Sequence, residues 1–267
     1  MIYERIYLDD EKRVYIDAYA NTDRRLKPLD AMLVIPGGGY GCVCSDREGE
    51  PIALSFLSHG INSFSLNYRT GKDVVKYPDQ LVDAAKAMAY VKENAEKYNI
   101  NPDRVFAVGF SAGGHLCGTL ATLHEEAEEI LGLPKDTARP TGVVLSYPVV
   151  TALHNTHRGS FERLLAKPFD EITEEEKMHF SLEMNINKDT SPAFIWHTAE
   201  DKVVPPVGSI RLAEAYVRAG AKVELHLYPY GSHGLALSND VTVAKGQQIQ
   251  PKAEVWVKEA VEWMKTV

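Results

Sequence analysis

The pentapeptide Gly109-Phe110-Ser111-Ala112-Gly113 has the pattern G-x-S-x-G and lies between two segments of different character. The apolar run at residues 104–108 before it predicts a buried strand, and the sequence from Ser111 onward predicts a helix. A serine at such a sharp strand-to-helix turn is held in strained backbone geometry with its hydroxyl exposed. Glycines two positions before and after it are needed because any Cβ there would collide with the neighbouring strand or helix. Ser111 is therefore a candidate nucleophile.

The rest of the chain alternates short apolar stretches with amphipathic ones, which favours an α/β fold: a mostly parallel sheet with helices on both faces. The length of 267 residues favours one domain, residues 1–267. A turn at residues 101–103 is expected to break the chain before the strand that leads to Ser111. The predicted strands cover residues 13–19, 31–35, 62–68, 104–108, 142–147, 193–197 and 222–227, and the predicted helices cover residues 79–98, 209–218 and 253–264 in addition to the one that Ser111 opens.

Residues 151–190 depart from this alternation. They are polar, charged and without a strand signal, although they separate two predicted core strands. Insertions of this length between core strands are often lids or binding loops. We therefore expect a small lid-like insertion over one end of the sheet, within the single domain.

A glycine run follows the predicted strand at residues 31–35: Pro36-Gly37-Gly38-Gly39-Tyr40. Glycines at a strand end let backbone N–H groups approach a ligand closely. Together with the residue after the nucleophile, such a loop can form an oxyanion hole, so Gly38, Gly39 and Ala112 are the candidates, and Tyr40 is a further one. The alternative is a phosphate loop, but position 42 is Cys where that loop would need glycine, and no Walker lysine follows.

An acid and a base follow the serine in the chain order that this kind of site requires. Asp201 comes just after the predicted strand at residues 193–197, and Glu200 beside it is the alternative acid. His233, in Gly231-Ser232-His233-Gly234, follows the last predicted strand and can take the serine proton while Asp201 orients its ring. His115, on the helix after Ser111, and His197, within a buried strand, are interpreted as structural.

An excess of acidic residues limits the partners of this chain. There are 37 Asp plus Glu against 29 Lys plus Arg, a formal net charge of −8, and no basic stripe. Such a chain is a poor candidate for binding nucleic acid or an anionic membrane surface. The N-terminus lacks the apolar run of a secretory signal, and no stretch approaches 18 apolar residues. We therefore expect a cytoplasmic protein.

Three cysteines, Cys42, Cys44 and Cys117, are too few for a disulfide framework. We interpret them as reduced thiols that act as small buried apolar residues. Cys42 and Cys44 have no second pair of ligands for a zinc site. The sequence therefore implies no metal and no cofactor.

Several motifs along the chain resemble one known family. PGGGY, REGEPIALSF, LNYR, YPDQLVDAAKAMAYV, NPDRVFAVGFSAGGHL, SYPV, WHTAEDKVVP and GSHG are similar to motifs of the acetyl-esterase and acetylxylan-esterase-like branch of the α/β-hydrolases, which is related to hormone-sensitive-lipase-type esterases. The resemblance implies a catalytic triad of Ser111, Asp201 and His233, an oxyanion hole at Gly38, Gly39 and Ala112, and short acyl esters, such as acetylated sugars, as substrates. The chain departs from the lipase-like pattern at Pro36, where that group usually has histidine.

The expected activity is that of a serine carboxylesterase, which transfers an acyl group to water through an acyl-enzyme. An amidase or peptidase, such as an arylformamidase-like enzyme, could use the same triad, and a binding protein could use the same scaffold without catalysis. Tyr40, Glu48, His157 and Ser160 are candidate substrate contacts, with helix caps and surface polar residues as the alternative interpretation. A small-molecule ester is the expected partner, and the oligomeric state is open.

Overall fold

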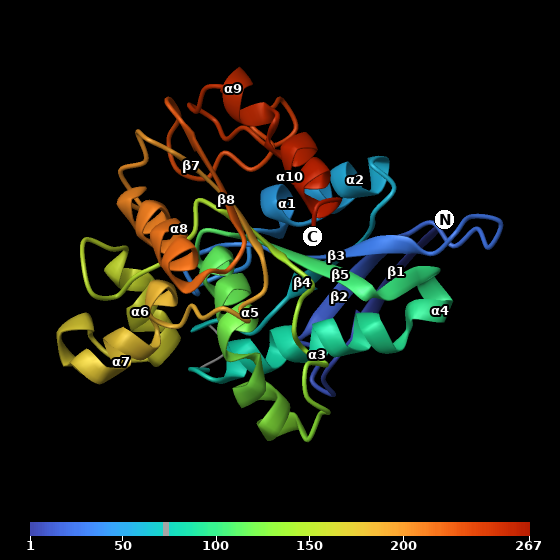
Figure 1. Ribbon diagram of the computed structural model, residues 1–267, viewed down its shortest axis with the longest axis horizontal. Coiled ribbons are helices and arrows are strands. Elements are labelled where there is room, and N and C mark those ends of the chain that lie inside the picture. Colours follow the sequence, from blue (N-terminus) through green and yellow to red (C-terminus); the bar gives the residue numbers. More distant parts are fainter. Residues whose placement is uncertain (72–74) are drawn as a thin grey trace.

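The computed structural model describes residues 1–71 and 75–267 (Figure 1). The strands are β1 (Ile2–Tyr7), β2 (Tyr15–Ala20), β3 (Leu29–Ile35), β4 (Asn62–Asn67), β5 (Ile100–Phe110), β6 (Val143–Ser146), β7 (Ala193–Thr198) and β8 (Val223–Tyr228). The helices are α1 (Ser45–Glu48), α2 (Glu50–Ser58), α3 (Asp79–Glu93), α4 (Ala95–Tyr98), α5 (Ala112–Leu131), α6 (Arg158–Leu165), α7 (Glu174–His179), α8 (Val207–Ala219), α9 (Pro251–Glu254) and α10 (Trp256–Met264), with 3₁₀ turns η2 (Phe169–Glu171) and η3 (Leu182–Met184).

Within the described residues, eight strands form one sheet in the order β1-β2-β4-β3-β5-β6-β7-β8. The pairs β1–β2 and β2–β4 are antiparallel, and every pair from β4–β3 to β7–β8 is parallel. Because β3, β5, β6, β7 and β8 are parallel, the loops at their carboxyl ends meet at one edge of the sheet. The predicted mostly parallel sheet is confirmed, and this edge carries the loops that hold the candidate site residues.

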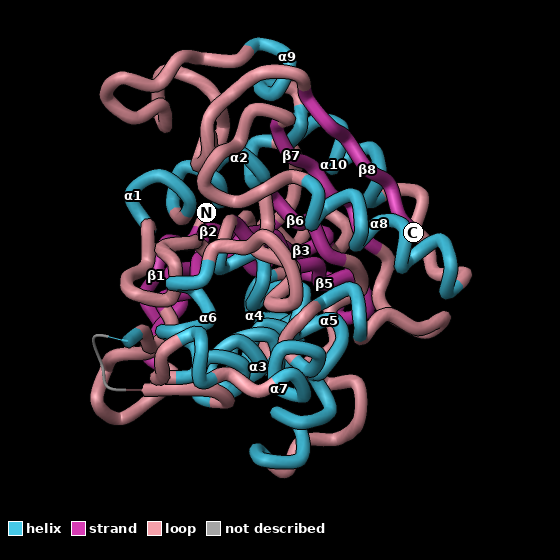
Figure 2. Tube along the Cα trace, turned by 90° about the vertical axis from the view of Figure 1, so that its left-hand side faces the viewer, coloured by secondary structure: helices cyan, strands magenta, loops and turns pink. Residues whose placement is uncertain are grey.

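Helices cover both faces of the sheet, with α3 and α5 on one face and α2 and α10 on the other (Figures 1 and 2). The side chains of β5 alternate between the two layers: Val105 and Ala107 belong to one buried apolar cluster, and Phe106 and Val108 belong to the other. A strand buried on both faces needs a continuous apolar sequence, which explains why residues 104–108 show no polar alternation. The central position of β5 places its carboxyl end, and Ser111 after it, in the middle of the sheet edge.

Several predicted elements have different bounds in the structure, most clearly the long helix, the C-terminal helix and the strand that leads to Ser111. The helix predicted over residues 79–98 ends at Glu93, because Asn94 leaves the helical conformation and its side-chain amide donates to the carbonyl of Tyr90. The C-terminal helix begins earlier than predicted and is divided at Val255. The predicted break at residues 101–103 is a bulge inside β5: Leu29 pairs with Ile100 but Ala31 with Val105, so residues 101–104 have no partners on β3.

The antiparallel edge strand β1 and the short helices α1 and α2 were not predicted from the sequence. Residues 2–7 do alternate between half-buried and exposed side chains, but the polar and aromatic residues there weaken the period-2 signal. No helix in residues 1–71 or 75–267 is both long and apolar enough to cross a membrane.

The segment between β6 and β7 contains α6, η2, α7 and η3 and no strand, in agreement with the absence of a strand signal there. It packs on the main core through buried apolar side chains, including Phe161, Leu164 and Leu182. Leu182 lies so close to α5 that a Cβ at Gly118 would be 2.5 Å from Leu182 Cδ1. The segment is therefore held firmly against the helix that begins after Ser111.

Candidate active site

Ser111 occupies the tight turn between β5 and α5. Its backbone has φ +54° and ψ −117°, a conformation that L-residues rarely adopt and that is typical of functional strain. A Cβ on Gly109 would lie 2.2 Å from the carbonyl oxygen of Gly113, and one on Gly113 would lie 2.3 Å from the carbonyl oxygen of Ile35. Only glycine fits at either position, so the sequence G-x-S-x-G is a steric requirement of this turn.

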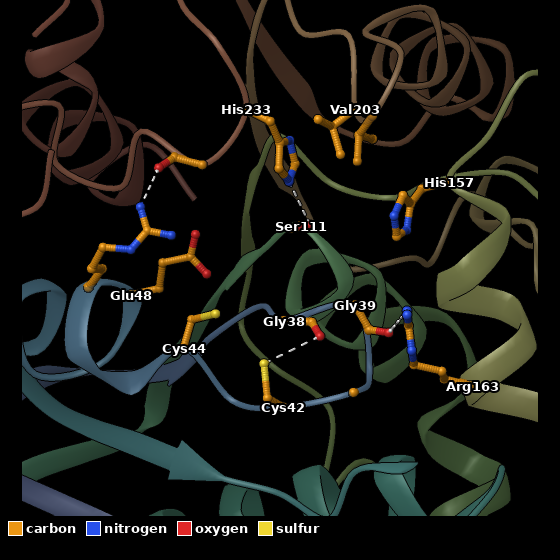
Figure 3. A pocket seen from close by; sticks show the side chains of 14 residues that line it. Gly38, Gly39, Cys42, Cys44, Glu48, Ser111, His157, Arg163, Val203 and His233 are labelled. Atoms are coloured by element: carbon orange, nitrogen blue, oxygen red, sulfur yellow. Dashed lines mark hydrogen bonds between the residues drawn. The ribbon is translucent and has the colours of Figure 1, made fainter. Parts of the chain in front are cut away.

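Ser111, His233 and Asp201 form a continuous hydrogen-bonded chain. Figure 3 shows its first link, between Ser111 and His233. The Oγ atom of Ser111 is 2.8 Å from Nε2 of His233, and Nδ1 of His233 is 2.6 Å from Oδ2 of Asp201. The carboxylate can only accept, so Nδ1 carries the proton and Nε2 accepts the serine O–H. The loop after β7 supplies the carboxylate and the loop after β8 supplies the imidazole.

The side chain of Asp201 is 0% exposed, and both of its carboxylate oxygens accept hydrogen bonds. Its Oδ1 atom accepts from the N–H groups of Val203 and Val204, both at 2.9 Å, and its Oδ2 atom lies 3.1 Å from Nε2 of His197. Burial alone would raise the pKa of this carboxyl, but hydrogen bonds from His197 and His233 outweigh it and hold the pKa below its ordinary range. Glu200, the alternative acid, is exposed and accepts from the N–H of Gly231.

The glycine run after β3 lies directly against Ser111. Gly38 and Gly39 both have positive φ, +128° and +61°, and a Cβ on Gly37 would lie 3.0 Å from Cβ of Ser111. The carbonyl oxygen of Gly38 accepts from the N–H groups of Gly41 and Cys42, which closes the turn. Among the described residues, no acceptor is hydrogen-bonded to the N–H groups of Gly38, Gly39 or Ala112, so all three are free to donate to a ligand.

Glu48 holds the glycine loop after β3 in place through a hydrogen bond. Its buried carboxylate accepts from the N–H of Gly37 at 2.8 Å and from the hydroxyl of Tyr147 at 2.7 Å. The Tyr147 hydroxyl also accepts from the N–H of Ala236, in the loop that carries His233. Burial raises the pKa of Glu48 despite the hydrogen bonds from Tyr147 and Gly37, which act to lower it. Glu48 and Tyr147 thus join the glycine loop to the His233 loop.

The four candidate substrate contacts take different places. Glu48 and His157 line the cavity that contains Ser111, which has a volume of about 510 Å³. Ser160 is buried behind His157, with its Oγ 2.9 Å from Nδ1 of that residue. The Tyr40 side chain is buried behind the glycine loop, where its hydroxyl is 2.8 Å from Nδ1 of His115. The side chains of Ser160 and Tyr40 are therefore buried and do not line the cavity.

His115 is structural, as predicted, and its burial has a consequence for stability. It is 1% exposed, and its Nε2 lies 2.8 Å from the carbonyl oxygen of Phe180. Burial lowers the pKa of His115 from 6.5 to about 4, against the opposing effect of the Phe180 hydrogen bond. Between these values the unfolded chain binds a proton that the folded chain does not bind. The free energy of unfolding should therefore fall as the pH drops through this range, by about 3 kcal/mol from this group.

The variant His115→Gln tests this pH dependence, because the amide can accept from Tyr40 and donate to Phe180 without titrating. Urea unfolding at pH 7, 5.5 and 4 should show a smaller loss of stability in the variant than in the wild type. Parallel pH profiles for the two proteins would contradict the assignment.

The cysteines correct one expectation. All three are free thiols, but only Cys117 is buried, whereas Cys42 and Cys44 are partly exposed on the cavity wall. Burial, followed by the charge of Glu48, raises the pKa of the Cys44 thiol to about 12, so this group stays protonated near neutral pH. Across residues 1–71 and 75–267, no group of three His, Cys, Asp or Glu side chains is placed to hold a metal ion.

Two residues hydrogen-bonded to predicted site residues were not predicted as part of the site. His197 was set aside because it lies within a buried strand, yet its side chain reaches Asp201. The sequence feature that could have indicated this contact is the position of His197 four residues before Asp201, in WHTAED. Tyr147 was part of the quoted motif SYPV, but nothing in the sequence showed that its hydroxyl would bridge two loops.

Comparisons with known proteins agree with this geometry. The BD-FAE family model matches residues 16–216. The chain is 41% identical to endo-1,4-beta-xylanase B of Butyrivibrio fibrisolvens over 79% of its own length, and 30% identical to an acetylxylan esterase of Xylanibacter ruminicola over 76%. These matches span only 33% and 40% of the two relatives.

A solved structure resembles the whole chain. The acetyl ester-xyloside bifunctional hydrolase of Caldicellulosiruptor lactoaceticus has 30% sequence identity and a TM-score of 0.83, over 98% of this chain and 96% of that one. The mostly parallel sheet and the serine turn after β5 are the features of the α/β-hydrolase fold. The chain therefore belongs to the BD-FAE family, within the acetylxylan-esterase-like branch of the α/β-hydrolases.

Proposed function

We propose that this chain is a serine carboxylesterase that hydrolyses short-chain acyl esters, in particular acetyl esters of carbohydrates. The observation that carries the proposal is the hydrogen-bonded chain from Ser111 Oγ through His233 to Asp201, at 2.8 and 2.6 Å. A serine hydroxyl that donates to a neutral imidazole can lose its proton as it attacks an ester carbonyl. Acyl transfer to water uses all three groups in these roles, as nucleophile, base and orienting acid.

The first step is attack of Ser111 Oγ on the carbonyl carbon, with transfer of its proton to Nε2 of His233. Asp201 stabilises the imidazolium through Nδ1–H and keeps the ring in position. The developing oxyanion takes hydrogen bonds from the N–H groups of Ala112 and of Gly38 or Gly39, which have no other acceptor among the described residues. The N-terminus of α5 adds its positive dipole end at the same point.

The second half of the reaction uses the same groups in reverse. His233 gives its proton to the leaving alcohol, and the C–O bond to that alcohol breaks to leave the acyl group on Ser111. Water then loses a proton to His233 and attacks the acyl-enzyme. The acid is released and Ser111 regains its proton.

The names of the relatives support a carbohydrate acetyl ester as the substrate. One relative is an acetylxylan esterase, and the bifunctional hydrolase matched over almost its whole chain acts on acetyl esters. The match to the bifunctional hydrolase covers almost the whole of both chains, whereas this chain spans less than half of the two sequence relatives. The cytoplasm stays the predicted compartment from the sequence.

The cavity wall formed by residues 151–190 suits a polar alcohol. His157, just before α6, and Arg163, within α6, both line the cavity (Figure 3). Burial lowers the pKa of His157, so its imidazole is neutral near pH 7. Arg163 donates to the carbonyl oxygens of Gly39 and Gly159. We propose that this insertion covers the site and that His157 contacts sugar hydroxyls through Nε2.

The substrate proposal is tested with p-nitrophenyl acetate, butyrate and octanoate, with p-nitroacetanilide as the matched amide and with acetylated xylo-oligosaccharides. We expect the highest kcat/KM for acetate, the lowest for octanoate, release of acetate from the oligosaccharides and no cleavage of the anilide. Cleavage of the anilide at a rate comparable with the acetate ester would favour an amidase. No turnover of any ester would contradict the proposed function.

A further inference from the structure

We infer that His197 is a positioning residue, which holds the Asp201 carboxylate in the orientation that it needs to accept from His233. This inference rests on the proposed function, because it assigns a role within the same hydrogen-bonded chain. His197 lies in the last part of β7 and is 0% exposed. Its ring touches three groups on the β7–α8 connection and the start of α8: Asp201, Val204 and Ser209.

The hydrogen-bond partners determine which ring nitrogen carries the proton. Nε2 lies 3.1 Å from two acceptors, Asp201 Oδ2 and the carbonyl oxygen of Val204, so it must be the N–H. Nδ1 lies 2.8 Å from Oγ of Ser209, which is also buried. The Ser209 hydroxyl can donate to Nδ1, so that each ring nitrogen has a partner. The ring is thus a fixed donor aimed at Asp201.

His197 acts on the oxygen that faces His233. Oδ1 of Asp201 is held by the backbone N–H groups of Val203 and Val204, whereas Oδ2 receives only the two imidazoles. Without His197, Oδ2 would have His233 as its single donor. The carboxylate would then be less restrained about its Cβ–Cγ bond, and Oδ2 would carry more negative charge.

This extra charge would act on the titration of His233. A more basic Oδ2 stabilises the imidazolium form of His233, so removal of the His197 donor should move the acidic limb of the pH profile to higher pH. The other charged or titratable groups near His233 are Ser111, Glu48, His157 and Arg47. Arg47 donates to the carbonyl oxygen of Gly234, and the centre of the Tyr147 ring lies 5.1 Å from that of His233. None of them is altered by a substitution at position 197, so a change in titration would report on Asp201.

Two matched variants separate positioning from packing. In His197→Gln the side-chain amide reaches about as far as Nε2 and can replace the donor, whereas in His197→Asn it ends one methylene short. The pH dependence of kcat/KM for p-nitrophenyl acetate should be near wild type in the Gln variant. In the Asn variant kcat should fall roughly ten- to a hundredfold, as for loss of one hydrogen bond to a charged group, with KM little changed. Its acidic limb should move to higher pH.

A second readout does not depend on turnover. The imidazole of His233 can be titrated by NMR, and its Nδ1 proton, which donates to Asp201, can be observed downfield. The titration should shift to higher pH in His197→Asn and stay unchanged in His197→Gln. If the wild type hydrolyses no ester, the proposed function fails, yet this titration still decides the role of His197.

Ser209→Ala covers the case in which His197→Asn does not fold. It removes only the hydroxyl that keeps the proton on Nε2, so it should give a smaller shift in the same direction. Identical titration of His233 in the wild type, His197→Asn and Ser209→Ala would overturn the inference. An equal loss of kcat in the Asn and Gln variants without any pH shift would also overturn it, because it would show that the ring only packs.

Discussion

Replacement of Ser111 by alanine is expected to lower kcat for p-nitrophenyl acetate by about 10⁴- to 10⁶-fold, the range seen when a serine nucleophile is removed from an intact site. The Oγ atom is the group that attacks, and its hydrogen-bond partner is His233. The glycines that allow the turn stay in place, so the variant should fold and melt as the wild type does. The decrease in kcat is measured from the rate of p-nitrophenol release at saturating substrate.

Ser160→Ala is the matched control for this experiment. Ser160 is also a buried serine near the cavity, but its Oγ bonds to His157 and not to His233. It should keep most of its kcat. If Ser111→Ala retained a rate similar to that of Ser160→Ala, Ser111 would not be the nucleophile.

Replacement of Asp201 by asparagine is expected to lower kcat by about 10⁴-fold, as when the acid of a Ser-His-Asp triad is made an amide. The carboxylate accepts from four donors: His197, His233, Val203 and Val204. An amide has only one oxygen, so its NH₂ group must face at least one of these donors. The expected result is a flipped or displaced His233 ring whose Nε2 no longer accepts from Ser111.

The neighbouring acid supplies the control. Glu200→Gln changes an exposed side chain that accepts from the N–H of Gly231, and it should leave kcat within a few-fold of wild type. The rates of both variants are compared across pH 6 to 9. A normal rate in Asp201→Asn, or an equal loss in Glu200→Gln, would show that Asp201 does not orient the base.

Much of the fold is readable from the sequence because its rules are local. The apolar run at residues 104–108 has the composition of a strand buried on both faces, and the glycines at 109 and 113 are required by contacts within the turn itself. The polar character of residues 151–190 agrees with a segment of helices and no strand. The bulge at residues 101–104 was not readable, because it depends on the register of β5 against β3.

Site residues could be predicted from the sequence only where they follow the end of a strand. Ser111 follows β5 directly, and Asp201 and His233 lie in the loops after β7 and β8, so their order and location are visible in the sequence. Tyr40 and Ser160 stand beside cavity residues in the sequence, but their side chains turn into the protein. His197 lies inside β7, where a histidine is ordinarily structural, and its contact with Asp201 depends on how the next turn folds back.

The role of Ser111 as the nucleophile is tested most directly by treating the protein with a fluorophosphonate and locating the adduct by peptide mass spectrometry. An activated serine beside a neutral imidazole reacts with such a probe, whereas ordinary serines do not. We expect one adduct, on Ser111, that removes esterase activity in proportion to labelling and is absent from Ser111→Ala. An adduct on another residue, or full ester hydrolysis by a protein in which Ser111 stays unlabelled, would contradict it.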